Sequence, residues 1–372
     1  MSFNDAGLNL KADRGGSDAT ILLRPCVIPE GDLRWLMTGN QYIVQILGLR
    51  KQNAREAIMR VMVDMARSKG VALILVASPA LAQASNELDA LRTRALELVN
   101  QSRAEHDLEP LQQGSLMDAA ALGHAEDMLA RDYYAHQSPE GEKVQDRFQD
   151  EGGSQWELVA ENIARCTGCS AIDAARVEAL HEGWMNSPGH RENILTAGLA
   201  RFGYGIVVED GQLYAVQTFA GPGQPRGLES GETAEPVAED AMTAVLLETL
   251  NAERDEQGVE PLQASAALDE AAQSLLPRDI GNFAVNTTVN VFGALPRNAR
   301  AGWGSISTIF GACGGCGERP THTDLESFVE QWLGKASYRG TLLDPEFTAA
   351  GVVLRADGAG RKVVLLVLGT SR

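Results

Sequence analysis

Two histidines and one glutamate in the middle of the chain have the side chains best suited to chemistry. His136 lies in a turn-rich segment, Glu161 precedes Asn-Ile, and His190 follows Ser-Pro-Gly. Two neutral imidazoles and one carboxylate could bind Zn²⁺ or another divalent ion, with water as the remaining ligand, and such an open site could activate water. The same side chains could instead form a hydrogen-bonded network that fixes loops. Both interpretations stay open at this point.

The residues before His190 predict how it is held. A helix carrying Trp184 runs into Pro188 and Gly189, which end it because proline lacks an amide hydrogen and glycine accepts a reversed backbone. We expect Ser170 to cap this helix and the helix to end at Ser187. His190 is therefore predicted on a bend at a helix end, a position that tends to face a cleft.

Other candidate residues receive simpler interpretations. His124 lies mid-helix and is expected to be a core or surface histidine, and His181 is expected to face solvent. Ser138 and Ser187 each lie near a histidine, but neither has the glycine-flanked strand-to-helix elbow of a serine nucleophile. The sequence therefore does not indicate a serine hydrolase.

Residues 65–84 have the pattern of a secretory signal peptide. A short basic start precedes the apolar run 71–77, and Ala82-Gln-Ala84 offers a cleavage site before Ser85. The run is shorter than the roughly 20 residues that cross a bilayer, so no stable membrane span is expected after cleavage. Because signal peptides begin at the initiator methionine, we expect translation to start at Met62 or Met65. Residues 1–64 would then be a gene-model extension or disordered; the alternative is a genuine N-terminal segment.

Export also decides how the cysteines are interpreted. Besides Cys26 the chain has two Cys-x-x-Cys motifs, Cys166/Cys169 and Cys313/Cys316. In a reducing cytosol these would suggest zinc or a redox pair. In an oxidising compartment we expect two local disulfides, Cys166–Cys169 and Cys313–Cys316. A thioredoxin-like site is disfavoured because neither motif follows a strand and opens a helix in a βαβ unit.

Composition limits the partners and the number of domains. The net charge of −18 repels phosphate backbones, so a nucleic acid partner is not expected. A chain of 372 residues with 44% hydrophobic residues is long enough for two cores.

The apolar periodicity predicts helices over 85–104, 115–131 and 144–149, and a hairpin of strands 202–208 and 213–219. Residues 222–240 are rich in Gly, Pro and Glu and read as a linker.

Beyond the linker the chain repeats itself at an offset of roughly 150 residues. Near the start of each copy, Asn251 and Arg254 repeat Asn100 and Arg103. Further along, the second copy also repeats the first at these positions: Trp332 with Trp184, Arg339 with Arg191, Leu343 with Leu195, Gly351 with Gly203, and the second Cys-x-x-Cys motif with the first. We infer a tandem duplication of one fold, with domains at 86–221 and 241–372, the second closing with a hairpin of 350–355 and 362–368.

Three motifs in order resemble the bacterial branch of the CAP superfamily (SCP domain; cysteine-rich secretory, antigen 5 and pathogenesis-related proteins). They are His136-Gln-Ser-Pro, Ala160-Glu-Asn-Ile and Trp184-Met-Asn-Ser-Pro-Gly-His-Arg-Glu-Asn-Ile-Leu. The resemblance implies an α+β class, with tandem α-β-α sandwich domains in which helices flank a small antiparallel sheet. It also implies a cleft of two histidines and often two glutamates that binds metal in some members.

Carried over by position, the resemblance implies His136, Glu161 and His190 as metal ligands. The fourth position falls on Ser187, and Glu182 is not expected to replace it because it lies on a different helix face. In the second copy Tyr338 stands for His190 and Thr308 for Glu161. The second domain is therefore expected to be degenerate, with a structural or recognition role.

The sequence as a whole predicts a secreted or periplasmic protein that binds or scaffolds through the cleft of its first domain. A lipid, cell-wall material or a protein is the expected ligand, with Zn²⁺ or another divalent metal as the candidate cofactor. The alternative is a metal-dependent hydrolase that uses the same cleft, although the sequence does not itself establish catalysis.

Overall fold

The structure is a computed structural model that describes residues 21–22, 33–38, 41–46, 79–228, 232–281, 283 and 290–372. The chain divides into two compact units, Met1–Asn86 and Glu87–Arg372. In the first unit, strands β1 (Ile21–Leu22), β2 (Leu33–Thr38) and β3 (Gln41–Ile46) pair antiparallel. The sequence analysis predicts no strands there. Cys26, the candidate start sites and residues 65–78 of the predicted signal peptide lie outside the described residues.

The first domain is built on a four-stranded sheet in the order β4-β6-β7-β5. Its strands are β4 (Gln112–Gln113), β5 (Leu158–Thr167), β6 (Arg201–Glu209) and β7 (Gln212–Gly221). The hairpin of β6 and β7 is confirmed, and Asp210 and Gly211 take the positive φ angles that its tight turn needs. The predicted antiparallel sheet is confirmed apart from β4, which pairs parallel to β6. Strand β5 lies at the edge of this sheet.

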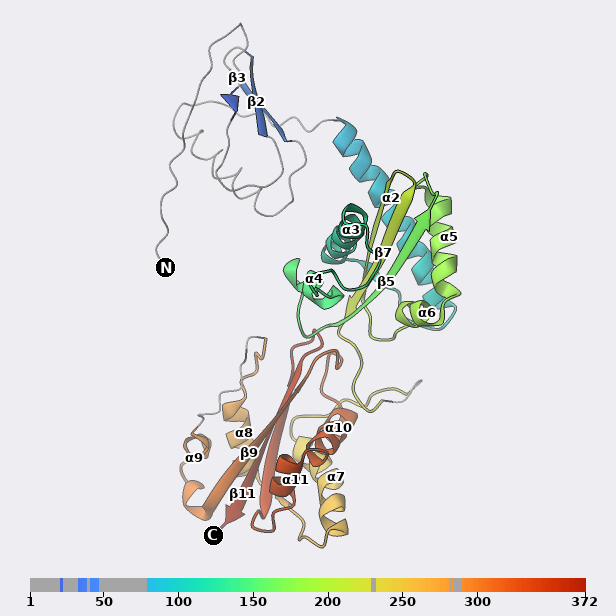
Figure 1. Ribbon diagram of the computed structural model, residues 1–372. Helices are drawn as coiled ribbons and strands as arrows, with labels where there is room; N and C mark the ends of the chain where they lie inside the picture. The colour runs from blue at the N-terminus through green and yellow to red at the C-terminus, as the bar shows by residue number, and fades with distance from the viewer. Residues whose placement is uncertain are drawn as a thin grey trace. The chain divides into compact units, whose positions relative to one another are not determined.

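Helices cover both faces of this sheet (Figure 1). They are α2 (Pro79–Ala104), α3 (Ser115–Ala130), α4 (Val144–Asp150), α5 (Ala174–Met185) and α6 (Pro188–Ile194). Strand β7 alternates between the two layers: Leu213 and Phe219 pack with α2, α5 and α6, whereas Tyr214 and Val216 pack with α3. The predicted α-β-α sandwich is therefore present.

The second domain repeats the sheet in the order β8-β10-β11-β9. Its strands are β8 (Gln263–Ala264), β9 (Trp303–Cys313), β10 (Ala349–Ala356) and β11 (Lys362–Ser371). Its helices are α7 (Met242–Glu256), α8 (Ala266–Leu275), α9 (Val291–Ala294), α10 (His322–Leu333) and α11 (Ala336–Leu342), with a 3-10 turn at Arg300–Gly302.

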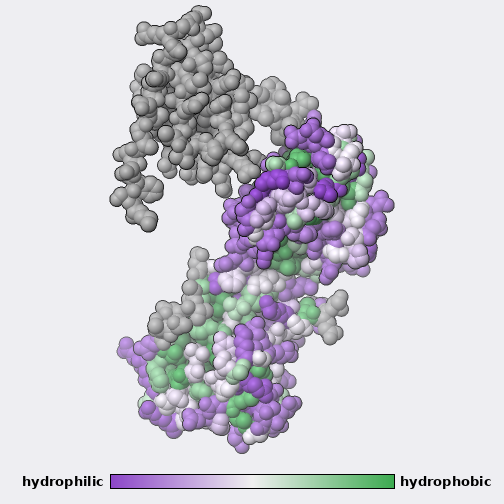
Figure 2. Space-filling model, viewed as in Figure 1, coloured by the Kyte–Doolittle hydropathy of each residue, from purple (hydrophilic) through white to green (hydrophobic). Residues whose placement is uncertain are grey.

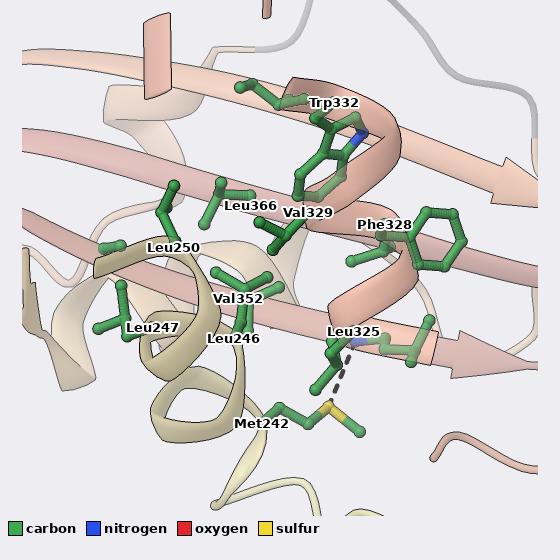
Figure 3. Packing of buried hydrophobic residues seen from close by; sticks show 14 of the residues in the cluster. Met242, Leu246, Leu247, Leu250, Leu325, Phe328, Val329, Trp332, Val352 and Leu366 are labelled. Atoms are coloured by element: carbon green, nitrogen blue, oxygen red, sulfur yellow. Dashed lines mark hydrogen bonds between the residues drawn. The ribbon is translucent and has the colours of Figure 1, made fainter. Parts of the chain in front are cut away.

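One of the two cores of the second domain lies between the sheet and helices α7 and α10. Figure 3 shows Leu246 and Leu250 of α7 facing Val329 and Trp332 of α10 beside the sheet. The sulfur of Met242 accepts a hydrogen bond from the backbone amide of Leu354 at 3.3 Å, which ties the start of α7 to β10.

A buried arginine repeats in both copies and supports the duplication at atomic level. Arg103 is 1% exposed and Arg254 is 0% exposed. Each donates to backbone carbonyls that close the end of its own domain, those of Glu109, Ile194 and Thr196 in the first and of Glu260, Leu342 and Asp344 in the second. Burying a guanidinium is costly unless its donors are satisfied, so the same solution in two places indicates one ancestral fold.

A close helix-to-sheet approach repeats as well. A Cβ on Gly203 would lie 2.1 Å from the carbonyl carbon of Met117, and one on Gly351 would lie 2.2 Å from the amide nitrogen of Asp269. The helices α3 and α8 therefore rest directly on strand backbone, which only glycine permits.

Several local predictions need correction. The N-cap of α5 is Asp173, whose carboxylate accepts the amide of Arg176 at 2.9 Å, and not Ser170; the helix ends at Met185. Helix α2 begins at Pro79 and not at residue 85 as predicted.

The two local disulfides, Cys166–Cys169 and Cys313–Cys316, are confirmed. Within the described part of the chain, no helix is both long and apolar enough to cross a bilayer. The visible face of 86–228, 232–281 and 290–372 is mainly hydrophilic (Figure 2).

Candidate functional site

The site of the first domain is centred on the carboxylate of Glu161 on edge strand β5. Its side chain is 2% exposed. One oxygen, Oε1, accepts from Nδ1 of His136 at 2.9 Å, and the other, Oε2, accepts from Nη2 of Arg147 at 2.7 Å. The buried charge is therefore paired and hydrogen-bonded on both oxygens, as a buried carboxylate requires.

Arg147, on α4, is a site residue that the sequence analysis missed. Its guanidinium also donates to the carbonyls of His136 at 3.0 Å and of Glu142 at 3.2 Å. One buried cation thus holds both the loop that carries His136 and the carboxylate beneath it. The sequence predicted a short helix at 144–149, which contains Arg147, but no spacing rule linked Arg147 to Glu161.

The hydrogen bond to Glu161 fixes the orientation of His136. An ionised carboxylate only accepts, so Nδ1 of His136 must carry the proton and a neutral ring keeps its lone pair on Nε2. The side chain is 57% exposed, so this imidazole is oriented from below and open to solvent above. It is suited to accept a proton or to bind a ligand.

His190 lies on α6, a helix that contacts the edge strand β5. Its carbonyl accepts from Nδ2 of Asn162 at 3.1 Å, while Nδ2 of Asn193 donates to the carbonyl of Glu161 at 3.0 Å. Nε1 of Trp184 donates to the carbonyl of Ile163 at 3.1 Å. These side chains satisfy the free edge of β5, so α5 and α6 are fixed against the strand that bears Glu161.

Burial lowers the pKa of His190, and the neighbouring charge of His136 lowers it further. His190 is therefore neutral at neutral pH.

His124 on α3 backs the site. Of the two environments predicted for it, the core is the one found: the residue is 1% exposed and its Nε2 lies 3.0 Å from the carbonyl of Ala135. Nε2 is also 3.8 Å from Oε1 of Glu161, so the histidine contributes to the site from behind. Burial lowers the pKa of His124, which keeps it neutral next to Arg147.

Tyr134 forms an exposed aromatic rim that the sequence analysis did not single out. The residue is 43% exposed, and its hydroxyl donates to the carbonyl of Ile163 at 3.1 Å. The guanidinium of Arg165 lies 5.3 Å from the centre of its ring. An exposed aromatic ring held by its hydroxyl is suited to stack on a ligand.

The solvent-facing prediction for His181 is wrong. The residue is 8% exposed, and its Nε2 lies 2.9 Å from Oγ of Ser102, so it joins α5 to α2. Ser138 is buried and its hydroxyl accepts the amide of Glu142 at 3.2 Å, a turn contact that agrees with excluding a serine nucleophile. Glu182 is exposed and lies outside the site.

The structure does not by itself assemble a metal site. Among the described residues, no group of three or more His, Cys, Asp or Glu side chains is placed to hold an ion. Ligation by His136, His190 and Glu161 together therefore stays a prediction.

Strand register identifies the equivalent positions in the second domain. Gly203 pairs with Thr218, which pairs with Glu161; Gly351 pairs with Val367, which pairs with Thr308. Tyr338 is the third residue of α11, as His190 is of α6. The predicted replacements of Glu161 by Thr308 and of His190 by Tyr338 are confirmed.

Comparison with known proteins agrees with these motifs. Residues 96–219 match the cysteine-rich secretory protein family, CAP. The chain is 31% identical to the uncharacterized protein YkwD of Bacillus subtilis over 134 residues, 36% of this chain and 49% of the relative. It is 33% identical to the uncharacterized membrane protein YlbC of the same species over 111 residues, 30% of each chain. The chain thus spans half or less of the length of these curated relatives.

Among solved structures, an extracellular protein containing an SCP domain from Bacillus anthracis is similar at 22% identity and a TM-score of 0.30, covering 57% of this chain and 67% of that one. The match over residues 96–219, which spans His136, Glu161 and His190, assigns the first domain. Over these residues, the first domain is similar to the CAP family.

Proposed function

We propose that this CAP-domain protein is secreted or periplasmic and acts at the cell envelope as a binding or scaffold protein, through the cleft formed by His136, Glu161, His190 and Tyr134. The ligand is a lipid, cell-wall material or another protein. The exposed ring of Tyr134 offers an apolar surface, and the oriented imidazole of His136 offers a polar contact.

The observation that carries this proposal is the duplication, which serves as an internal control. The second domain has the same strand order and the same buried arginine, yet Thr308 and Tyr338 replace the carboxylate and the imidazole. The fold therefore does not need the paired charges of Glu161 and Arg147. Burying them is costly, so their presence in the first domain supports a role in binding.

Co-sedimentation with defined envelope probes tests the proposal. The full chain is mixed either with purified peptidoglycan sacculi or with vesicles of phosphatidylglycerol and phosphatidylethanolamine. We expect one probe to retain the protein and His136→Ala or His190→Tyr to abolish retention. Tyr338→Phe in the second domain is the matched control and should bind normally. Retention by neither probe, or equal retention of all variants, would contradict an envelope-binding cleft.

A divalent metal such as Zn²⁺ is a second proposal, supported by the His136 pair. A carboxylate that holds Nδ1 of a histidine leaves Nε2 in the orientation typical of a metal ligand. In this arrangement His136 and His190 would be the protein ligands with water completing the shell, and Glu161 would orient His136. A bound ion would supply Lewis acidity to the metal-dependent hydrolase that is the alternative function.

Calorimetric titration with Zn²⁺ separates these possibilities. We expect binding to the wild type that is lost in His136→Ala and in His190→Ala. Unchanged titration in both variants would exclude this site. Hydrolytic activity that survives a chelator would exclude the metal-dependent hydrolase.

A further inference from the structure

The two Cys-x-x-Cys loops are equivalent in sequence but differ in what they contact. The first, Cys166–Cys169, lies over its own hairpin, where the amide of Gly168 donates to the carbonyl of Gly211 at 2.7 Å. A Cβ on Gly168 would meet nothing within 4 Å. Gly168 in this loop is exposed, whereas Cys169 is buried in the core of its own domain.

The second loop, Cys313–Cys316, contacts the first domain through backbone. The amide of Gly315 donates to the carbonyl of Trp156 at 2.7 Å, and the amide of Gly317 donates to the carbonyl of Pro222 at 2.8 Å. Gly223 and Cys316 form an antiparallel bridge. The loop thus pairs with one end of the first sheet, where Trp156 precedes β5 and Pro222 follows β7, since Leu158 of β5 pairs with Gly221 of β7.

Glycines make this approach possible. A Cβ on Gly223 would lie 2.0 Å from the carbonyl oxygen of Gly315, and one on Gly314 would lie 2.9 Å from the carbonyl oxygen of Trp156. Gly223 and Gly315 also have positive φ angles, of 76° and 63°. Three glycines at one contact indicate a surface shaped for backbone-to-backbone docking.

A cation–π contact reinforces the same surface. The guanidinium of Arg361 lies 4.3 Å from the centre of the Trp156 ring, and the residue is 5% exposed. Arg361 also donates to the carbonyls of Ile280 and Phe283 of its own domain, so its position is fixed by the second domain. A desolvated cation over a Trp ring contributes more than an exposed one.

We propose that the loop closed by Cys313–Cys316 is an intramolecular docking element that attaches the second domain to the end of the first sheet where Trp156 and Pro222 lie. This assigns a task to the second domain, which keeps the fold and loses the cleft. It also gives the duplicated disulfides different tasks: the second shapes a docking surface, and the first shapes only its own turn. Reduction of Cys313–Cys316 is therefore expected to loosen the attachment.

Hydrogen exchange of the full chain tests this, because the amides of Gly315 and Gly317 are protected only through the contact. Gly223→Ala inserts a methyl against Gly315 without altering the disulfide. Gly168→Ala is the matched control, since Gly168 has a similar φ of 79° but open space around it. We expect exchange of the peptide 311–319 to accelerate about tenfold in Gly223→Ala and to be unchanged in Gly168→Ala.

A second pair of variants tests the disulfides. Cys313→Ser/Cys316→Ser should accelerate exchange of the same peptide, and Cys166→Ser/Cys169→Ser should not. Equal exchange in Gly223→Ala and Gly168→Ala, or equal exchange in the two serine variants, would overturn the proposal.

Discussion

The buried pair of Glu161 and Arg147 allows a quantitative test of how the cleft is held. Their side chains are 2% and 8% exposed, so solvent has little access to either charge. Removing one member of a buried pair costs about 3–5 kcal/mol because the other charge stays buried. Arg147→Met also removes the donors to the carbonyls of His136 and Glu142, so we expect about 4 kcal/mol of destabilisation.

Glu161→Thr introduces the residue found in the second domain. The guanidinium of Arg147 then keeps two carbonyl acceptors, so we expect a destabilisation of about 3 kcal/mol. The double variant buries no unpaired charge and should cost no more than Arg147→Met alone, which corresponds to a coupling of at least about 3 kcal/mol. The assay is pulsed hydrogen exchange of β5 peptides across a urea titration, which reports the first domain alone. Single effects below about 1 kcal/mol that add in the double variant would refute a buried, coupled pair.

Three further predictions follow from other parts of the structure. Burial lowers the pKa values of His124 and His181 below 6.5, so the unfolded chain takes up protons before the folded chain as the pH falls. The stability of the first domain should therefore be constant above about pH 6.5 and fall below it. Urea unfolding from pH 7 to pH 5 measures this fall, which should be shallower in His124→Gln. Ser102→Ala leaves Nε2 of buried His181 without its partner and should cost about 1–3 kcal/mol at pH 7; a change in denaturation midpoint equal to that of the exposed control Ser170→Ala would contradict this. Gly203→Ala and Gly351→Ala should each destabilise their own domain by more than about 3 kcal/mol, because a methyl at either position overlaps helix backbone, and calorimetry would contradict the duplicated packing if one of them were tolerated.

The fold was predictable where periodicity and turn chemistry agree. Alternating apolar residues and Asp210-Gly211 predicted the first hairpin, and the internal repeat predicted the second domain. The short strands β4 and β8 were missed because two exposed residues carry no periodic signal. The cap of α5 was misplaced since Ser170 and Asp173 both suit an N-cap, and sequence alone does not say which one begins the helix.

The site was predictable in part. Motif spacing singled out His136, Glu161 and His190; the structure brings Glu161 against His136, and ligation by all three residues stays a prediction. Arg147 and His124 reach the carboxylate only through packing of α4 and α3 on the edge strand, which no local pattern encodes. His181 was misassigned for the same reason: its polar partner, Ser102, is distant in sequence.

The central claim is that the first domain binds through side chains that the fold itself does not require. The direct measurement is co-sedimentation with the envelope probe that retains the wild type. It compares a triple variant, Arg147→Met, Glu161→Thr and His190→Tyr, with the control Tyr338→Phe. We expect the triple variant to stay folded, as judged by hydrogen exchange, and to lose retention, while Tyr338→Phe is retained like the wild type. Full retention of a folded triple variant would contradict it.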